Sequence, residues 1–448
     1  MQELISEYDY DVLIIGGGIS GMQAAIDLGD LGHSVLLIEK QASIGGTMIQ
    51  LSKVFPTLDC ASCITTPKMS SAFHHPNVTV MTLSTLKSFS QLENEMFEVV
   101  IKEKARYVDT EKCTGCNECA EKCPAIAIDN GYDENLGFIK AIGVPFQTAL
   151  PQKAYLDIDN CTQCGRCANV CPTEAIDFDM EDEDHTYKVR SVIIATGFKE
   201  TPTIKSTYGG GKIKNVVTGK QMERLLAPTG PAGGVFRPSD GKVPWSIAYV
   251  QCAGSRDETI GVPYCSAICC MFAIKQAILL SGALPLADIT IYNMDIRTFG
   301  KQYEEFYQMS RDMGINFVKG KVAKIQEIEN GDLKFHVEVF GEDGGLETFE
   351  HDLAVLSLGV VPQFGDEMAS IIPVARSNEG FIQEIRMSME PGITSIPGVF
   401  ATGMATSPRD IVDSIVSGSA IANKTSIWLE GGLRESFFAK NFLMIKGG

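Results

Sequence analysis

The most constraining feature of the chain lies near its N-terminus, where a short apolar run, a glycine-rich turn and a helix follow one another. Val12 to Ile15 is apolar and rich in β-branched residues, which is typical of a buried parallel strand. The turn from Gly16 to Gly21 reads GGGISG and leads into a helical pattern from Met22 to Leu31. A second strand from Ser34 to Ile38 ends at Glu39. This order of elements predicts an α/β unit that cradles a dinucleotide.

Each glycine of the turn has a physical role in such a unit. Gly16 permits the tight turn, Gly18 lets the backbone approach a pyrophosphate, and Gly21 lets helix and strand pack closely. The helix N-terminus offers free N–H groups and a partial positive charge to phosphates. The carboxylate of Glu39 can accept a hydrogen bond from a ribose hydroxyl. The alternative is a glycine-rich turn that binds nothing. The residues predicted to bind the dinucleotide here are Gly16, Gly18, Ile19, Ser20, Gly21, Glu39 and Lys40.

Composition narrows the functional classes. The 448 residues allow two to four domains, and the net charge of −18 argues against a nucleic-acid partner. No run of eighteen apolar residues occurs, so no membrane span is expected. The acidic N-terminal residues lack the layout of a signal peptide, and the 14 cysteines suggest metal or redox chemistry in a reducing compartment. A cytoplasmic location is therefore expected.

Two cysteine runs are the most specific signal in the sequence. Each has the spacing C-x2-C-x2-C-x3-C followed by proline, which is the pattern of a bacterial-type ferredoxin with two [4Fe–4S] clusters. The fourth cysteine of each run ligates the other cluster, so Cys171 is expected to complete the first set and Cys123 the second. Zinc is the alternative for any four cysteines. The predicted ligands are Cys113, Cys116, Cys119, Cys123, Cys161, Cys164, Cys167 and Cys171.

A second set of cysteines follows a strand predicted from Trp245 to Gln251. The segment from Cys265 is expected to open a helix to about Leu280, which would make Cys265 and Cys269 neighbours on one helical face. With Cys252 at the preceding strand end, four thiols converge, and we interpret them as a third [4Fe–4S] site. Buried cysteine packing is the alternative. The predicted ligands are Cys252, Cys265, Cys269 and Cys270.

Cys60 and Cys63 form a C-x-x-C pair that the three sets leave over. A redox pair, half of a metal site and two buried structural thiols all fit this spacing. The turn after the strand ending at Gln251 has one glycine, with Arg256 and Asp257 where a nucleotide-binding turn must be slim. NAD(P)H binding by this second unit is therefore doubtful.

Three further segments resemble flavin enzymes of the glutathione reductase type. In that class a glycine pair lies against the dinucleotide, a strand running into a glycine turn closes the first half of the flavin domain, and a late helix points its N-terminus at the flavin ring. Met404 stands where the class usually has aspartate. The corresponding residues here are Gly45, Gly46, Thr47, Ala195, Thr196, Gly197, Gly403, Asp410 and Ile411.

Taken in order, the motifs resemble the heterodisulfide reductase family, specifically its flavin-carrying A-type subunits. The matching stretches are GGGISG, IGGTM, FPTLDCASC, the paired C-x2-C-x2-C-x3-CP runs, C-x12-C-x3-CC and GMATSPRDI. The resemblance implies FAD, three [4Fe–4S] clusters, and Lys275 as a catalytic residue near the reactive edge of the flavin. Helical geometry alone supports this role weakly, because an exposed lysine is the commoner outcome there. Longer family members carry further iron–sulfur domains, so fewer electron routes are expected here.

The expected fold is α/β: a flavoprotein with two dinucleotide-binding domains, like thioredoxin or glutathione reductase, and an inserted bacterial-type 2[4Fe–4S] ferredoxin domain. Residues 1–105, 183–243 and 359–448 are assigned to the flavin domain, with a linker in 200–243. Residues 106–182 are assigned to the ferredoxin domain. Residues 244–358 are assigned to a degenerate nucleotide-binding domain that carries the third cluster.

The resemblance implies an electron-transfer subunit of a heterodisulfide reductase-like complex in an anaerobe, with electron bifurcation as an open question. Candidate partners are B- and C-type subunits, a hydrogenase- or dehydrogenase-linked iron–sulfur subunit, ferredoxin, and a second copy of the chain. A stand-alone NAD(P)H:acceptor oxidoreductase and a non-enzymatic cluster scaffold are the rival functions. With only six histidines and no Ser/His/Asp set, hydrolytic chemistry has no evident machinery.

Overall fold

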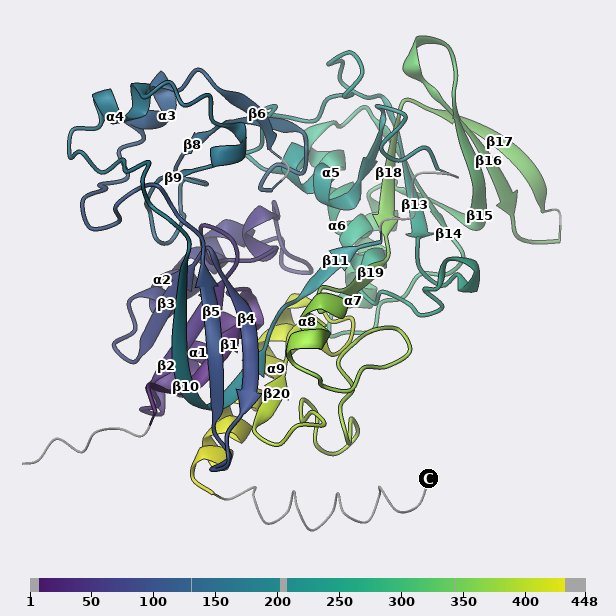
Figure 1. The fold of residues 1–448 in the computed structure, drawn as a ribbon. Coiled ribbons are helices and arrows are strands. Elements are labelled where there is room, and N and C mark those ends of the chain that lie inside the picture. The colour runs from purple at the N-terminus through teal and green to yellow at the C-terminus, as the bar shows by residue number, and fades with distance from the viewer. Residues whose placement is uncertain (1–7, 130, 202–207, 343, 432–448) are drawn as a thin grey trace, which may run out of the picture.

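The computed structural model of the chain describes residues 8–129, 131–201, 208–342 and 344–431. Two sheet-based bodies lie side by side, with a smaller lobe above the first (Figure 1). In these described ranges, no helix has the length and apolar character that a membrane crossing requires. The expectation about the N-terminal residues concerns 1–7, which lie outside the described part.

The first body is built on a seven-stranded sheet in the order β3-β2-β1-β10-β5-β4, with β20 also paired to β10. Its strands β1, β2, β3 and β20 run parallel to their partners, whereas β4, β5 and the first half of β10 form an antiparallel meander. The parallel part contains the α/β unit that the sequence predicted, and the meander extends the same sheet. The strands are β1 (Tyr10–Ile15), β2 (Val35–Glu39), β3 (Val78–Thr82), β4 (Ser84–Gln91), β5 (Phe97–Glu103), β10 (Glu183–Ile194) and β20 (Val399–Ala401).

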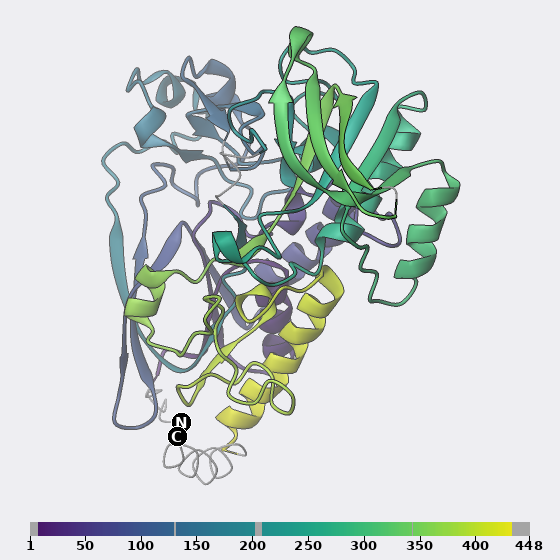
Figure 2. The same cartoon turned by 90° about the vertical axis from the view of Figure 1, so that its right-hand side faces the viewer.

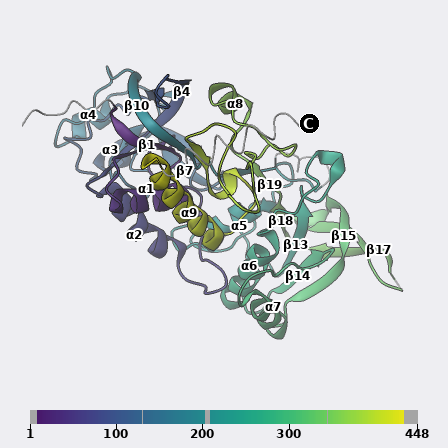
Figure 3. The same cartoon turned by 90° about the horizontal axis from the view of Figure 1, so that it is seen from below.

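Helices α1 (Ile19–Asp30) and α9 (Ile411–Leu429) pack side by side on one face of this sheet, although they are nearly 400 positions apart in sequence (Figure 3). Gly418 makes this contact possible, because a Cβ there would lie 2.6 Å from the carbonyl oxygen of Ser20. Helix α2 (Ala61–Phe73) completes this layer, and α8 (Asp366–Ile371) precedes the final strand. The core is apolar on both sheet faces, as an all-covered sheet requires.

The segment between β5 and β10 forms the smaller lobe, which Figure 1 shows above the first sheet in blue. It contains two short helices and two small antiparallel ladders, β6 with β7 and β8 with β9. Its elements are α3 (Glu118–Lys122), β6 (Ile126–Asp129), β7 (Gly137–Lys140), β8 (Ile142–Gly143), β9 (Tyr155–Leu156) and α4 (Arg166–Val170).

The second body is a seven-stranded sheet in the order β12-β18-β13-β14-β15-β16-β17. The parallel part runs from β12 to β15, and β15 to β17 form an antiparallel extension that projects to the right in Figure 1 and faces the viewer in Figure 2. Its strands are β12 (Val216–Thr218), β13 (Ser246–Ala253), β14 (Asp288–Asn293), β15 (Asn316–Glu327), β16 (Leu333–Val339), β17 (Gly345–His351) and β18 (Leu353–Leu358). Its helices are α5 (Gly219–Leu226), α6 (Cys269–Ala283) and α7 (Tyr303–Asp312).

Two features differ from the sequence expectations. Strand β11 (Phe198–Glu200), at the start of the stretch expected to be linker, pairs antiparallel with β19 (Val360–Pro362), and β12 lies within that stretch. Helix α5 also lies in this stretch and begins with a capping box between Thr218 and Gln221. The sequence of this stretch is typical of loops. The short strands were not predicted because the strands with which they pair lie far away in sequence.

Candidate functional site

A cavity of about 850 Å³ runs between the glycine-rich turn of the first body, the inserted lobe and the second body. One end is formed by Glu39 and the start of α1, and the other end by Cys269, Met404 and Asp410. Its size is at the upper end of what ligand pockets usually offer. The predicted residues that line it are Gly16, Gly18, Ile19, Ser20, Glu39, Lys40, Gly46, Thr47, Ala195, Thr196, Gly197, Asp410 and Ile411.

The glycine-rich turn leaves the start of α1 open to this cavity. The N-cap residue Gly18 has no side chain to cap the first turn, so the N–H groups there remain available for an anion. A Cβ on Gly16 would lie 2.4 Å from the carbonyl oxygen of Ala195, and Gly16 has φ +114°. Only glycine fits that position without displacing the backbone of the neighbouring strand.

Glu39 holds this turn in place from the end of β2. Its two carboxylate oxygens accept hydrogen bonds from the backbone N–H of Gly17 (2.8 Å) and of Gln41 (2.9 Å). Burial raises the pKa of this carboxyl, and the two backbone donors oppose the rise. Glu39 therefore combines a structural role in the turn with an acceptor at the wall of the cavity.

Three predicted residues do not line the cavity but pack the elements that form it. A Cβ on Gly21 would lie 2.0 Å from the carbonyl oxygen of Gly16, and one on Gly403 would lie 2.2 Å from Ser20 Oγ. A Cβ on Gly45 would press on Ile49 and Met69 at 3.2 Å. Their absent side chains set distances between elements, which spacing in the sequence does not distinguish from direct contact with a ligand.

The far end of the cavity is organised by α9 and by the segment before it. Asp410 caps α9 by accepting from the backbone N–H of Asp413 (2.8 Å), and its other oxygen accepts from Tyr303 of the second body. The hydroxyl of Thr196 is buried without a partner in the wall of the cavity. An unpaired buried hydroxyl is costly, so this wall fits a polar ligand such as the dinucleotide of FAD.

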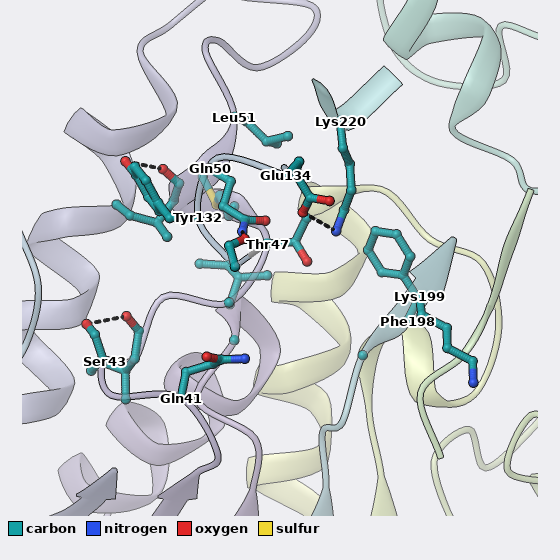
Figure 4. Close-up of a pocket in the computed structure, with 18 of the residues that line it drawn as sticks. Gln41, Ser43, Thr47, Gln50, Leu51, Tyr132, Glu134, Phe198, Lys199 and Lys220 are labelled. Atoms are coloured by element: carbon teal, nitrogen blue, oxygen red, sulfur yellow. Dashed lines mark hydrogen bonds and ion pairs between the residues drawn. The ribbon is translucent and has the colours of Figure 1, made fainter. Parts of the chain in front are cut away.

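Glu134, Lys220 and Glu200 line the same cavity from three different modules, and no motif in the sequence singled them out. The ammonium of Lys220 lies 3.1 Å from a carboxylate oxygen of Glu134, and Figure 4 shows this pair beside Phe198. Burial raises the pKa of Glu200 to about 7, against the lowering effect of Lys220. Sequence separation hides such a cluster, because each member comes from a different part of the chain.

Lys275 does not line the cavity among the described residues. It is 1% exposed on α6 and forms a buried ion pair with Glu223 of α5, so the exposed position that helical geometry favoured is wrong. Glu223 also accepts from Gln276 Nε2 (2.6 Å) and from the hydroxyl of Ser52 (2.7 Å). Burial lowers the pKa of Lys275, and Glu223 offsets part of that effect. The predicted catalytic role stays a prediction.

The cysteines of the inserted lobe fall into two neighbouring groups. Burial and the nearby thiols of Cys113 and Cys116 raise the pKa of Cys119 to about 11. Burial and the thiols of Cys161 and Cys123 also raise the pKa of Cys167. The Cys167 thiol also raises the pKa of Cys119, so the two runs lie close together, and the crossed ligand pattern stays a prediction.

The four cysteines of the third set lie close together, but the secondary structure around them differs from the expected one. Helix α6 begins at Cys269, and Cys265 lies in the preceding loop, so the expected i, i+4 pair on one helix is wrong. The helix cannot extend back through Ala267, which has φ +62° and whose N–H donates to Cys265 Sγ. Burial and the thiols of Cys252 and Cys265 nevertheless raise the pKa of Cys270 to about 11, so the set is close in space.

The thiols of these three predicted sets are donors for a soft metal. Within the described ranges, no three His, Cys, Asp or Glu side chains converge tightly enough for one ion. An iron–sulfur cube is wider than one ion and spaces its thiolates at separate corners. Twelve cysteines carry thiols free of disulfides, and soft thiolates of this kind are donors for both iron–sulfur clusters and zinc.

Cys60 and Cys63 form a disulfide at the start of α2, where Cys60 is the N-cap residue. Cys63 is exposed and Cys60 is partly exposed, so two buried structural thiols are excluded as an interpretation. Neither residue lines the large cavity.

The fold and the open turn define a class of protein. The sequence matches the family described as pyridine nucleotide-disulphide oxidoreductase over residues 10–419, and the chain belongs to this family. Solved structures agree on the fold. Thioredoxin reductase of T. acidophilum has a TM-score of 0.52 at 16% identity, covering 94% of this chain and 98% of that one. Thioredoxin reductase of Lactococcus lactis has a TM-score of 0.53 at 14% identity, covering 94% and 100%.

Comparison with two relatives narrows the class of protein further. The chain is 42% identical over 426 residues to the A-type subunit of H(2):CoB-CoM heterodisulfide,ferredoxin reductase from Methanothermobacter marburgensis, covering 94% of this chain and 64% of that protein. It is 45% identical over 427 residues to an A-type iron-sulfur subunit of CoB--CoM heterodisulfide reductase from Methanopyrus kandleri, again covering 94% and 64%. The chain thus spans less than two thirds of the length of these relatives.

Proposed function

We propose that the chain is an FAD- and iron–sulfur-containing electron-transfer subunit of a heterodisulfide reductase-like complex. The observation that carries the proposal is the combination, in one chain, of an open dinucleotide cavity with three groups of free cysteines. The relatives named as heterodisulfide reductase subunits support the same function.

FAD is the proposed occupant of the cavity. Its pyrophosphate would be held by the open N-terminus of α1 over Gly18, and its adenosine ribose by Glu39. Gly46 and Thr47 line the same wall, and Ala195 to Gly197 close it from the end of β10. When bound, FAD supplies an exchange between two-electron and one-electron transfer.

Three [4Fe–4S] clusters are the proposed one-electron carriers. Cys113, Cys116, Cys119 and Cys171 would hold one, and Cys161, Cys164, Cys167 and Cys123 a second, in an inserted ferredoxin-type domain. Cys252, Cys265, Cys269 and Cys270 would hold the third. Cys269 lines the cavity itself, which supports a short path between the third cluster and the flavin.

The protein's own contribution is position and electrostatics. The inserted lobe is fixed at the rim of the cavity by Lys220 and by Arg224, whose Nε donates to Asp133 (2.9 Å). Buried thiols and backbone donors around each cysteine group set the local charge, on which cluster potentials depend. Helices α5 and α6 each contribute residues to the cavity wall, and the buried Lys275–Glu223 pair between them is proposed to tune the electrostatic field there.

The proposed partners are the other subunits of such a complex, with ferredoxin as a candidate donor or acceptor. The name of the Methanothermobacter marburgensis relative includes ferredoxin as well as the CoB-CoM heterodisulfide. Identifying the subunits bound to this chain would show which electron donor and acceptor it serves.

A stand-alone NAD(P)H oxidoreductase is the competing proposal, because the matched family is defined by pyridine nucleotide use. The turn after β13 argues against it. Arg256 has positive φ there and its side chain pairs with Asp295, so a bulky charged group occupies the place where a nucleotide-binding turn is slim.

Anaerobic purification followed by FAD and iron analysis tests the main proposal. We expect about one FAD and about twelve irons per chain, since each cube carries about four irons. Reduction by NADPH should be slow, whereas a reduced low-potential donor such as dithionite should bleach the flavin and reduce the clusters. A yellow protein with few irons, or rapid bleaching by NADPH, would contradict it.

A further inference from the structure

The turn after β13 carries an arginine at a position whose backbone conformation favours glycine. Arg256 has φ +56°, in the left-handed region that a residue with a Cβ enters at a steric cost. Its backbone N–H donates to the carbonyl of Tyr264 (3.0 Å), and the next residue, Asp257, forms an antiparallel bridge with Val262. Backbone strain of this kind is concentrated at functional sites, so the Arg256 side chain is a candidate for a role of its own.

The guanidinium of Arg256 lies against the thiol of Cys252, one of the four predicted ligands of the third cluster. Its Nη1 donates to Cys252 Sγ at 3.9 Å. Both terminal nitrogens of Arg256 also donate to the carboxylate of Asp295, Nη2 at 3.3 Å from Oδ2. The Arg256 side chain is 22% exposed, so solvent screens its charge less than that of a fully exposed arginine. A fixed positive charge therefore lies beside this cysteine.

Asp295 does not cancel the charge of Arg256, because two guanidinium groups share its carboxylate. Nη2 of Arg297 lies 3.4 Å from Asp295 Oδ2, the oxygen that also accepts from Arg256 Nη2. The same loop lies beside a second predicted ligand, since the carbonyl oxygen of Asp295 is 4.0 Å from Cys270 Sγ. These three charged side chains carry a net positive charge at the edge of the third cysteine set.

A positive charge and an N–H donor beside a ligating thiolate act on an iron–sulfur cluster in the same direction. Reduction adds one electron to the cluster, and with it one negative charge, without forming or breaking a bond to the protein. A nearby guanidinium attracts the added charge, and a hydrogen bond to the sulfur stabilises it, so both favour the reduced state. A nearby carboxylate such as that of Asp295 opposes reduction.

We propose that Arg256 raises the midpoint potential of the third cluster through its charge and its hydrogen bond to Cys252, and that Asp295 holds the guanidinium in place. This inference rests on the proposed function. In that function the third cluster is the one next to the flavin, because its predicted ligand Cys269 lines the flavin cavity. The residue that obstructs a nucleotide in this turn thus sets the potential at which electrons pass between this cluster and the flavin.

The test is an anaerobic redox titration of the holoprotein followed by electron paramagnetic resonance. The third cluster is identified as the signal that Cys269→Ser lacks. Arg256→Gln keeps N–H donors but removes the charge, so it should lower the midpoint potential of that signal, and Arg256→Lys should lie closer to the wild type. Asp295→Asn removes the negative charge but keeps an acceptor for Arg256, so it should raise the potential. Arg311→Gln makes the same replacement at an exposed position of α7 and should match the wild type.

The outcomes separate this role from the proposed function. Opposite shifts in Arg256→Gln and Asp295→Asn support the role, because a general disturbance of the site would not change sign with the charge removed. An unchanged potential in Arg256→Gln, or shifts of both variants in one direction, overturns it, while the bound flavin and clusters still support the proposed function. If Arg256→Gln loads no third cluster, Asp295→Asn decides, and a potential at or below the wild-type value overturns the role. Wild-type protein without this signal would overturn the proposed function itself.

Discussion

At the scale of single residues, the buried side chain of His351 in the second body is expected to make the free energy of unfolding depend on pH. His351 is 6% exposed between the hydroxyls of Ser246 and Tyr292, which lie 2.8 Å from its two ring nitrogens. Burial lowers the pKa of His351 to about 4. The folded chain therefore keeps this ring neutral at a pH where the unfolded chain protonates it.

The predicted consequence is a loss of stability in mild acid. Because the folded pKa is lower than the unfolded one, the contribution is present above the unfolded pKa, about 6.5, and is lost as the pH falls toward 4. Between about pH 7 and pH 5 the free energy of unfolding should fall by about 2 kcal/mol from this group. In His351→Gln, denaturant unfolding at both pH values should show a free energy of unfolding without this pH-dependent contribution. Equal pH slopes in the two proteins would contradict the assignment.

Glu39 carries a second prediction at this scale. Glu39→Ala removes two hydrogen bonds to the backbone of the turn and the proposed acceptor of the ribose. Hydrogen bonds to a charged group are worth about 1.5–3 kcal/mol each, so FAD affinity should fall at least about tenfold. Titration of apoprotein with FAD, followed by flavin fluorescence, measures this. Glu93→Ala on the exposed β4–β5 turn is the control, and equal affinity in both variants would exclude Glu39 from the site.

At the scale of elements, α5 is the helix that fixes the inserted lobe to both bodies. Arg224 is 1% exposed and donates to Asp133 (2.9 Å), to the carbonyl of Gln50 (3.0 Å) and to the carbonyl of Thr229 (3.1 Å). Its guanidinium also lies 4.2 Å from the centre of the Tyr132 ring. One side chain therefore links three segments that are distant in sequence.

Arg224→Met should loosen this junction. Removing one partner of a buried ion pair costs about 3–5 kcal/mol, because the remaining charge stays buried. Hydrogen exchange in residues 131–150 should become faster, and Arg224→Lys should not restore it, since an ammonium cannot reach all three acceptors. Arg311→Met on the exposed face of α7 is the control. Unchanged exchange in this loop would show that other contacts hold the lobe.

The packing of α1 against α9 gives a further prediction for elements. Gly418→Val would place a side chain against the carbonyl of Ser20, where even a Cβ lies at 2.6 Å. Overpacking of this kind typically costs about 1–3 kcal/mol. Thermal unfolding of Gly418→Val should occur at a lower temperature than that of Ser419→Val, one position further round the same helix. Equal midpoints would mean that the two helices can separate without cost.

For the whole molecule, the three proposed cluster sites belong to separate structural units. Two lie in the inserted lobe, and the third lies where β13 and α6 meet in the second body. Cys269→Ser should therefore lower the iron content by about four per chain and leave the other two clusters intact. Iron analysis and electron paramagnetic resonance of the reduced protein test this. Loss of nearly all iron would mean that the sites assemble together.

Part of this architecture was predictable from local sequence. Strands β1, β2 and β13 and helix α1 were expected close to their observed bounds, because apolar periodicity and β-branched residues are local signals. The turn from Gly16 to Gly21 was likewise predictable, since its glycines are required by backbone sterics. The start of α6 was not, because a left-handed Ala267 depends on a tertiary contact between Val360 and Ser266 as well as on local sequence.

The sequence by itself determined the dinucleotide-binding unit, the cysteine runs and their grouping by spacing, because these depend on residues that are close along the chain. Only the tertiary structure decided that Lys275 is buried against Glu223, that Gly21, Gly45 and Gly403 pack rather than line the cavity, and that Glu200 meets Lys220 and Glu134. These relations join residues from different modules. Their free energies depend on burial and on distances in space, which no local pattern encodes.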